Sequence, residues 1–318
     1  MISFKHLQNA LLLAEHRNFH RAAEAGYVSQ SALSRSIQAL ENQLGVVLFT
    51  REYGNVEPTL FGQLLLERAP VILNETGELQ REIELLQGLE SGSLNVAAGT
   101  YAAELSVNAA VGQLIESYSR LTCRLHTVSW RDAIALVTSG EVDLGIAEIS
   151  DIDLGTELVV EPISSHRMGL FVRSGHPLCD LGRVYPADLA DFPMVSVRLP
   201  PRGRGLFPGQ TQLDPSTGDV LPSVEVDDFA GVLGVVKHSQ AFSVATFLQL
   251  EMYVRSGELA VLPFAAEWLR LDYGFIRRRR RMLSPATLAF QELVKGIEES
   301  LRARNLALYQ KFIGDTSD

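Results

Sequence analysis

The feature that most constrains this chain is a segment over residues 30–43 that separates into an apolar and a polar side. Four apolar residues recur at spacings of four, three and four, which is typical of one buried helical stripe: Leu33, Ile37, Leu40 and Leu44. Four polar residues share the other side: Ser31, Ser34, Arg35 and Gln38. The pattern predicts a helix with one side packed on a core and the other free to contact a partner.

A second, shorter helix is predicted just before this one. Asn18 can cap a helix over residues 19–25, whose small side chains allow close packing against a neighbour. Gly26 permits a tight turn, and Ser29 can cap the helix that follows. Two short helices joined by a tight turn predict a helix-turn-helix.

The residues after the polar-sided helix predict a β-hairpin, or wing. Residues 46–51 and 56–58 are strand-like, and Glu52-Tyr53-Gly54-Asn55 between them is rich in turn formers. Two interpretations of the polar side remain open. It is either the solvated face of an ordinary helical hairpin, or a face that reads the major groove, where arginine pairs with guanine and glutamine with adenine. A wing directly after the helix favours the second interpretation.

This order of motifs resembles the LysR-type transcriptional regulators. The residues that carry the resemblance run from Phe19 to Glu24, from Val28 to Arg35, and through Ile37, Leu40-Glu41, Leu44-Gly45, Leu48-Phe49 and Arg51, with Thr59-Leu60-Phe61-Gly62 after the wing. The resemblance implies sequence-specific binding to double-stranded DNA. It also implies a DNA-facing set made of Gln30, Ser31, Ser34, Arg35 and Gln38, with Arg51 in the wing near a phosphate or the minor groove.

Residues 59–90 are predicted to form one long helix. Leu65, Ile72, Leu79 and Leu86 repeat every seven residues, and three more residues follow the first three of them at four positions: Ala69, Thr76 and Ile83. Such a heptad seam indicates pairing with a second copy, although packing on the same chain is an alternative. The resemblance implies a linker helix that dimerises, so we expect a homodimer or homotetramer.

The rest of the chain predicts an α/β fold. Strands are expected at 94–98, 122–128, 142–149 and 271–276, with helices at 104–118, 131–138 and 285–309. Short helices between short apolar strands favour parallel pairing. The segments Ser139–Ile146, His176-Pro177-Leu178 and Asp188-Leu189 resemble the effector-binding region of the same family.

The resemblance implies a three-part architecture: a winged helix-turn-helix domain (1–58), a linker helix (59–90) and an effector-binding domain (91–318). The last part is expected to hold two α/β subdomains like those of periplasmic solute-binding proteins. Subdomain I would comprise 92–163 and 267–318, and subdomain II would comprise 164–266, with crossovers near 160–164 and 263–268.

Ligands of such folds lie at the carboxyl ends of parallel strands, in the crevice between subdomains. This rule selects ten effector-binding candidates: Thr100, Tyr101, Ser129, Trp130, Glu148, Ser196, Arg198, Asp227, Phe229 and Thr246. Backbone amides near Thr100 would suit a carboxylate, and Arg198, Arg202 and Arg204 could add charge-assisted bonds. We expect an organic acid or a polar aromatic metabolite. Trp130 could instead belong to the core, and Arg202 and Arg204 to a solvated loop.

Composition excludes several other classes. The net charge of −10 is unlike that of an indiscriminate nucleic-acid binder, and residues 1–62 are neutral with five basic and five acidic residues. No apolar run could span a membrane, no signal peptide is evident, and two cysteines make no disulfide framework, so we expect a cytoplasmic protein.

No catalytic or metal-binding motif is found. A Gly-x-Ser-x-Gly elbow and a His-Glu-x-x-His motif are both lacking, and Cys123 and His126 would point to opposite faces of a strand. We therefore expect no enzyme, no cofactor and no metal site. An enzyme or solute-binding protein with a coincidental helical hairpin is the alternative. The arginine run at 277–281 is interpreted as an exposed strand end or subunit contact.

Overall fold

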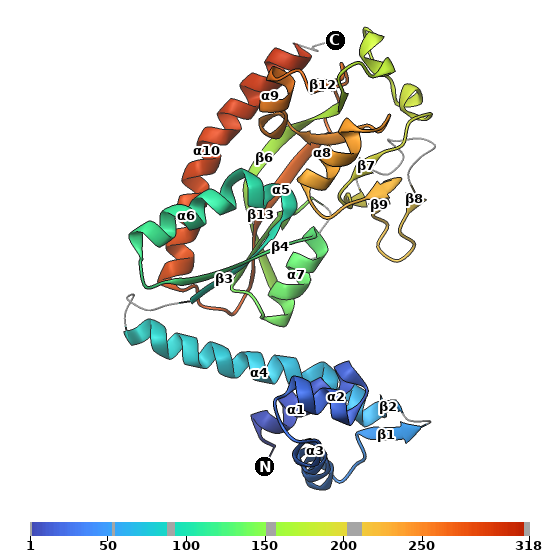
Figure 1. The fold of residues 1–318 in the computed structure, drawn as a ribbon. Coiled ribbons are helices and arrows are strands. Elements are labelled where there is room, and N and C mark those ends of the chain that lie inside the picture. The colour runs from blue at the N-terminus through green and yellow to red at the C-terminus, as the bar shows by residue number, and fades with distance from the viewer. Residues whose placement is uncertain (1, 53–54, 88–92, 151–156, 202–211, 315–318) are drawn as a thin grey trace. The chain divides into compact units, whose positions relative to one another are not determined.

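The computed structural model describes residues 2–52, 55–87, 93–150, 157–201 and 212–314. The chain divides into two compact units, Met1–Gln87 and Gly88–Asp318 (Figure 1). The first unit contains α1 (Phe4–His16), α2 (Phe19–Ala25), α3 (Gln30–Leu44), β1 (Phe49–Glu52), β2 (Asn55–Pro58) and α4 (Leu60–Gln87). The segments predicted as the head and the linker thus fall mainly in one unit.

The two helices of the predicted helix-turn-helix begin at the predicted caps. The Asn18 side chain accepts hydrogen bonds from the backbone of His20 (2.9 Å) and Arg21 (3.2 Å) at the start of α2. Ser29 Oγ accepts one from Ala32 N (3.2 Å) at the start of α3. These caps satisfy amides that have no partner within the helix. Gly45, with φ of 71°, ends α3 in a left-handed conformation.

The apolar stripe of α3 forms the centre of the first unit's core. Leu33, Ile37 and Leu40 are buried against α1, α2 and the hairpin, and each buried leucine or isoleucine stabilises the fold by roughly 1.5–3 kcal/mol. Leu44, the last residue of the predicted stripe, is instead exposed, because α3 ends there.

The turn between α2 and α3 differs from the sequence interpretation. Gly26 has an ordinary φ of −86°, and the left-handed residue is Tyr27, with φ of 51°. A Cβ added to Gly26 would lie 2.9 Å from Leu12 Cδ1 and 3.3 Å from the carbonyl oxygen of Ala22. Gly26 therefore serves close packing of α1 and α2, whereas Tyr27 makes the turn.

The wing is a two-stranded antiparallel hairpin. Phe49 pairs with Pro58, and Glu52 pairs with Asn55. Behind it, Thr59 Oγ1 donates to the carbonyl oxygen of Val47 (2.7 Å) and accepts from Gly62 N (3.1 Å). A Cβ on Gly62 would overlap the carbonyl oxygen of Leu48, so this glycine lets α4 start directly behind the hairpin.

The second unit is built on a seven-stranded sheet in the order β11-β6-β13-β5-β3-β4, with β12 also paired to β6. Its strands are β3 (Ser93–Gly99), β4 (Thr122–Val128), β5 (Leu144–Glu148), β6 (Leu158–Arg173), β11 (Ser243–Thr246), β12 (Leu259–Val261) and β13 (Arg270–Arg278). The predicted parallel pairing occurs between β3 and both β4 and β5. No direction was predicted for β13, which is antiparallel to both β5 and β6, so the sheet is mixed.

The long strand β6 belongs to both predicted subdomains. Its first part, from Leu158 to Arg167, pairs with β13, and its last part, from Met168 to Arg173, pairs with β11 and β12. The expected crossover near 160–164 is thus part of one continuous strand. The register with β13 shifts between Tyr273 and Gly274, opposite Ser164 and Pro162, so a β-bulge marks the predicted subdomain boundary.

Helices cover the sheet of the second unit (Figure 1). The helical stretch after β3 begins at Thr100, four residues before the predicted start, and comprises α5 (Thr100–Ala102), the π-helical η1 (Ala103–Val107) and α6 (Asn108–Ser117). The other helices are α7 (Trp130–Ser139), α8 (Phe229–Lys237), α9 (Phe247–Arg255) and the long α10 (Pro285–Ile313).

The predicted subdomains I (92–163 and 267–318) and II (164–266) are called the first and second lobes of the second unit below. The second lobe also carries short elements: η2 (Pro177–Asp180), η3 (Pro186–Leu189), β7 (Val195–Ser196), β8 (Gln212–Leu213), β9 (Val220–Leu221) and β10 (Val224–Glu225). Within the described residues, no helix is long and apolar enough to cross a membrane. In the same described residues, no three His, Cys, Asp or Glu side chains lie together where they could hold a metal ion.

Candidate DNA-binding helix and effector cavity

The polar side of α3 faces outward from the first unit. Gln30, Ser31, Arg35 and Gln38 are exposed, and Ser34 is half-buried, while the opposite stripe is packed in the core. The side chain of Arg35 is anchored to its own helix, since Nε donates to the carbonyl oxygen of Ser31 (3.2 Å). This leaves the rest of the guanidinium directed away from the core. The helix therefore presents an exposed set of donors and acceptors.

Contacts at the middle and near the carboxyl end fix the orientation of α3. Asn9 Nδ2 on α1 donates to Ser36 Oγ (2.7 Å). The carboxylate of Glu41 accepts hydrogen bonds from Leu48 N (2.7 Å) and Phe49 N (3.3 Å), which ties the wing to the helix. Arg51 lies in β1 opposite Val56, but its side chain is outside the described part of the structure.

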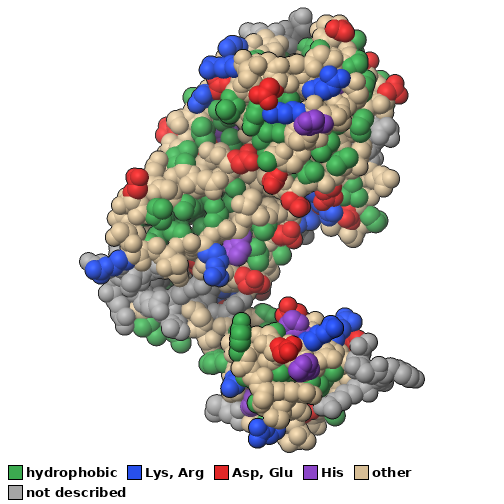
Figure 2. Space-filling view, viewed as in Figure 1, with side chains coloured by type: hydrophobic (Ala, Val, Ile, Leu, Met, Phe, Trp, Pro, Cys, Tyr) green, Lys and Arg blue, Asp and Glu red, His purple; other side chains and the backbone are tan. Residues whose placement is uncertain are grey.

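Charges of both signs are interspersed on the visible face of the molecule, without a single-sign patch (Figure 2). This agrees with the neutral balance of the first 62 residues. Recognition of DNA by such a surface depends on placement of a few side chains rather than on a broad basic field.

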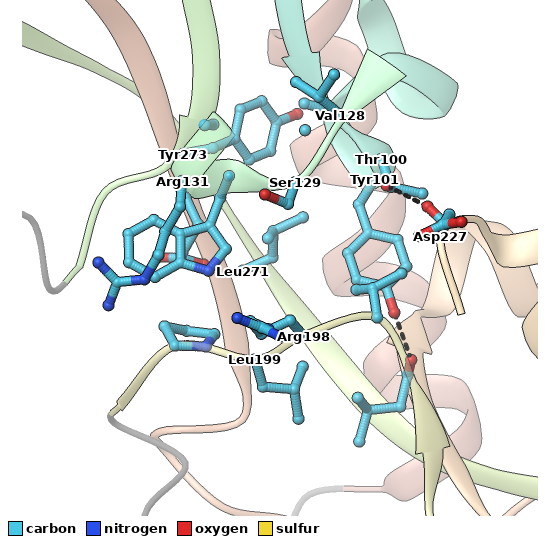
Figure 3. A pocket seen from close by; sticks show the side chains of 18 of the residues that line it. Thr100, Tyr101, Val128, Ser129, Arg131, Arg198, Leu199, Asp227, Leu271 and Tyr273 are labelled. Carbon is cyan, nitrogen blue, oxygen red and sulfur yellow. Dashed lines mark hydrogen bonds between the residues drawn. The ribbon is translucent and has the colours of Figure 1, made fainter. Parts of the chain in front are cut away.

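The second unit contains a cavity of about 660 Å³. Seven of the ten predicted effector residues line it: Thr100, Tyr101, Ser129, Trp130, Glu148, Arg198 and Asp227. They come from the carboxyl ends of β3, β4 and β5, from the start of α7 and from the second lobe. Figure 3 labels five of them: Thr100, Tyr101, Ser129, Arg198 and Asp227. Neighbouring residues after β3 bond across to the second lobe here: Thr100 Oγ1 donates to the carbonyl oxygen of Asp227 (3.0 Å), and Tyr101 Oη to that of Val244 (3.1 Å).

Three predicted residues do not line this cavity. Ser196 is fully buried in β7. Phe229 packs edge-on against Tyr101 and Phe171 at the start of α8. Thr246 caps α9, and its hydroxyl donates to Gln249 Oε1 (3.0 Å). Arg202 and Arg204 lie outside the described residues.

The arginines of the cavity are already paired with carboxylates. Arg131 binds the fully buried Asp219 through two bonds of 2.5 and 2.7 Å, and this pairing raises the pKa of Arg131. Arg198 binds Glu225 at 3.2 and 3.3 Å and Asp214 at 3.4 Å. The expectation that Arg198 is available to a ligand carboxylate is thus weakened, because a ligand would have to compete with two acidic residues.

The walls of the cavity are largely apolar. Trp130, Trp268 and Leu271 line it together with several aliphatic side chains. Trp130 is also 93% buried in a core cluster, so it belongs to both the core and the cavity wall. The guanidinium of Arg131 lies 4.1 Å from the centre of its ring. A ligand with an apolar body fits these walls.

Two helical segments start at the cavity. Gly99 precedes the helical stretch beginning at Thr100 and provides no side-chain cap. Ser129 caps α7 through Asp132 N (3.2 Å), and the amides of the first helical turn point toward the start of the helix. First-turn amides of two helices carry partial positive charge, which favours an anionic or strongly electronegative group.

A buried polar cluster behind the cavity was not predicted from the sequence. His166 Nε2 lies 2.7 Å from Glu298 Oε2, and Tyr273, which lines the cavity, donates to the same carboxylate. Burial alone would raise the pKa of Glu298, but hydrogen bonds, with that of His166 first, outweigh it and hold the pKa below its ordinary value. The three residues come from β6, β13 and α10, far apart in sequence, so no local pattern could reveal them.

The arginine run at 277–281 lies at and beyond the end of β13. Arg279 and Arg280 are exposed. Arg281 is buried against Asp143 and donates to the carbonyl oxygen of Val142 (2.5 Å). One arginine of the run is therefore a structural tie between β13 and the start of β5.

Comparison with known proteins supports both halves of this description. Residues 4–63 match the model of the bacterial regulatory helix-turn-helix protein, lysR family, and residues 87–297 match that of the LysR substrate binding domain. The SDS degradation transcriptional activation protein of Pseudomonas sp. (strain ATCC 19151) is 34% identical over 92% of this chain and 96% of its own length. The HTH-type transcriptional regulator GbpR of Azospirillum brasilense is 28% identical over 97% of this chain and 90% of its own.

The fold is also shared with solved structures. The full-length regulator CbnR, in complex with its target DNA, superposes with a TM-score of 0.62 at 22% identity, covering 93% of this chain and 100% of CbnR. At this identity the match establishes the fold. Together with the two family models, it leads to one conclusion: this chain belongs to the LysR family of bacterial transcription regulators, proteins that bind DNA and carry an effector domain and are not enzymes.

Proposed function

We propose that α3 reads base edges in the major groove through Gln30, Ser31, Ser34, Arg35 and Gln38, with Arg51 of the wing on the DNA backbone. The observation that carries this proposal is the outward polar side of α3 opposite a packed apolar stripe. Arginine and glutamine are the side chains that form bidentate bonds with guanine and adenine. Such a regulator acts where the chromosome is, in the cytoplasm.

The proposed assembly is a homodimer, or a tetramer built from dimers, paired through α4. Three of the predicted seam residues, Ile72, Leu79 and Ile83, are exposed on the single chain. Leu65 packs against the core of the first unit and Ala69 is buried, so the seam is anchored at its start and exposed at the three isoleucine and leucine positions that follow. Exposed aliphatic residues at heptad spacing are stabilised when a second helix covers them.

The proposed effector is a small organic acid with an apolar body. Its carboxylate would lie at the starts of the helices at Thr100 and Ser129, and its body against Trp130, Trp268 and Leu271. Because Arg131 and Arg198 are held by carboxylates, the backbone amides would be the main anion-binding groups. Effector binding would change the relative orientation of the two lobes and, through it, how the oligomer binds DNA.

Selection of duplexes from a random library with the full chain tests the DNA-binding proposal. Wild type should select a defined sequence, and Arg35→Ala should reduce affinity for it. The matched control is Arg302→Ala, because Arg302 is an exposed arginine of α10 in the second unit. If Arg35→Ala binds the selected duplex like the control, the assignment of α3 as the reading helix is wrong.

Thermal shift with matched acids and amides tests the effector proposal. Phenylacetate and hexanoate are compared with phenylacetamide and hexanamide. A ligand at 100 times its Kd stabilises the folded state by about 2.7 kcal/mol. An acid should raise the unfolding midpoint more than its amide, and Thr127→Phe, which fills the cavity from an exposed lining position, should abolish the difference. If the amides are equally effective, the effector is not recognised as an anion.

A further inference from the structure

Tyr27, in the turn before α3, combines two unusual properties. Its φ of 51° is left-handed, one of only two such values among the described non-glycine residues. Its side chain is 98% exposed, the highest value among the large hydrophobic side chains. An aromatic residue in this position neither relieves the backbone nor adds to the core.

Folding alone would favour another residue at this position. A left-handed backbone is disfavoured by roughly 1–2 kcal/mol for a residue with a side chain and is adopted most readily by glycine or asparagine. The preceding Gly26 does not make the turn: its φ is −86°, and its lack of a Cβ allows the close contact with Leu12. The stability cost of Tyr27 is thus not offset by packing within the first unit.

The turn holds Tyr27 in a defined place. Tyr27 N donates to the carbonyl oxygen of Glu24 (3.1 Å), and Val28 N donates to that of Ala23 (3.0 Å). Val28 packs against the head core, and Ser29 caps α3. The ring therefore projects from a fixed backbone two residues before the cap and three residues before the exposed Gln30, where the polar side begins.

We propose that Tyr27 is a DNA contact, and that its hydroxyl donates a hydrogen bond to a phosphate oxygen beside the groove entered by α3. This inference rests on the proposed orientation of α3 toward DNA. The start of a recognition helix enters the groove, so residues just before it lie near the flanking sugar-phosphate backbone. Tyrosine hydroxyls are regular donors to phosphate, and such contacts position the protein without reading sequence.

Two substitutions separate the contact from a structural role. Tyr27→Phe keeps the ring and the backbone conformation but lacks the hydroxyl, so affinity for the selected duplex should fall by about 13–160-fold, as expected for one hydrogen bond to a charged acceptor. Tyr27→Asn should weaken binding at least as much, while raising the unfolding midpoint by a few degrees because asparagine tolerates a left-handed φ. Stability and affinity should thus change in opposite directions.

A comparison of two duplexes shows whether the lost affinity comes from a contact with a phosphate or with a base. In Tyr27→Phe, affinity for a scrambled duplex should fall by the same factor as affinity for the selected duplex. The dependence of affinity on salt concentration should not change, because the hydroxyl is uncharged. Unaltered affinity in Tyr27→Phe and Tyr27→Asn would overturn the contact. A loss confined to the selected duplex would overturn the phosphate assignment in favour of a base. Failure of the underlying orientation is recognised separately, by Arg35→Ala binding like wild type.

Discussion

The polar side of α3 and the cavity of the second unit both carry arginines, but these arginines are in opposite situations. The bond described for the Arg35 side chain goes to the backbone of its own helix. Arg131 and Arg198 are each bound to carboxylates of the second lobe. A surface that binds a polyanion keeps its cations available, whereas the cations of the cavity are held by carboxylates, and Arg131 joins the two lobes in this way. Substitutions in the first region should therefore affect DNA affinity, and those in the second should affect stability.

The largest effect is expected from the buried cluster behind the cavity. Glu298→Ala leaves His166 and Tyr273 without their shared acceptor, and removal of one partner from a buried pair costs about 3–5 kcal/mol. Urea unfolding of the full chain measures this loss. The control is Glu299→Ala, at an exposed neighbouring position, which should stay within about 0.5 kcal/mol of wild type. Equal stability of the two variants would contradict the role of the cluster.

A smaller loss of stability is expected at the edge of the cavity. Arg131→Ala leaves the carboxylate of Asp219 buried without its cation, and the lost charged hydrogen bonds should cost about 1.5–3 kcal/mol. Calorimetry can measure the shift. The double variant Arg131→Ala/Asp219→Ala should recover part of the loss, because no charge is then stranded. A double variant that is less stable than the single one would argue against this explanation.

On α3 the expected effect is on affinity. Arg35→Ala should weaken binding to the selected duplex by about 1–3 kcal/mol, the value of a good bidentate contact with a base. Its unfolding free energy should change by less than about 0.5 kcal/mol, because the side chain is exposed. Fluorescence anisotropy and urea unfolding provide the two readouts. A large loss of stability would erase the contrast between the two regions.

The smallest expected effect is a pH dependence. The pKa of Glu298 is lower in the folded chain than its ordinary value near 4.5, so its contribution is fully present above that value and is lost as the pH falls through the folded pKa. Acid unfolding of wild type should therefore be steeper below about pH 4.5 than that of Glu298→Gln, which cannot titrate at this position. Identical acid profiles would mean that the carboxylate makes no pH-dependent contribution.

The contrast also explains which features were predictable from the sequence. The starts of α2 and α3 were predicted to the residue, because caps and stripes are local signals carried by Asn18, Ser29 and the leucines between them. Seven cavity residues were found from the rule on carboxyl ends of strands. The pairing of Arg131 with Asp219 was missed because it joins positions 88 residues apart.

Other differences arise from the tertiary structure as well. The antiparallel β13 was not predicted, because its direction depends on the return of the chain from the second lobe rather than on its own residues. The early start of the helix at Thr100 was missed because Gly99 offers no side-chain cap to mark it. The turn was assigned to Gly26 rather than to the left-handed Tyr27, because glycine is the usual turn residue and the contact of Gly26 with Leu12 is not visible in the sequence.

The single strand β6 has a practical consequence for protein engineering. Since its two parts pair with different lobes, excising residues 164–266 as an autonomous module would cut the strand at the bulge and expose unpaired edges on both fragments. Chimeric regulators that exchange ligand preference should therefore transplant the entire second unit. Grafting one lobe onto a foreign counterpart would instead be expected to yield aggregating material.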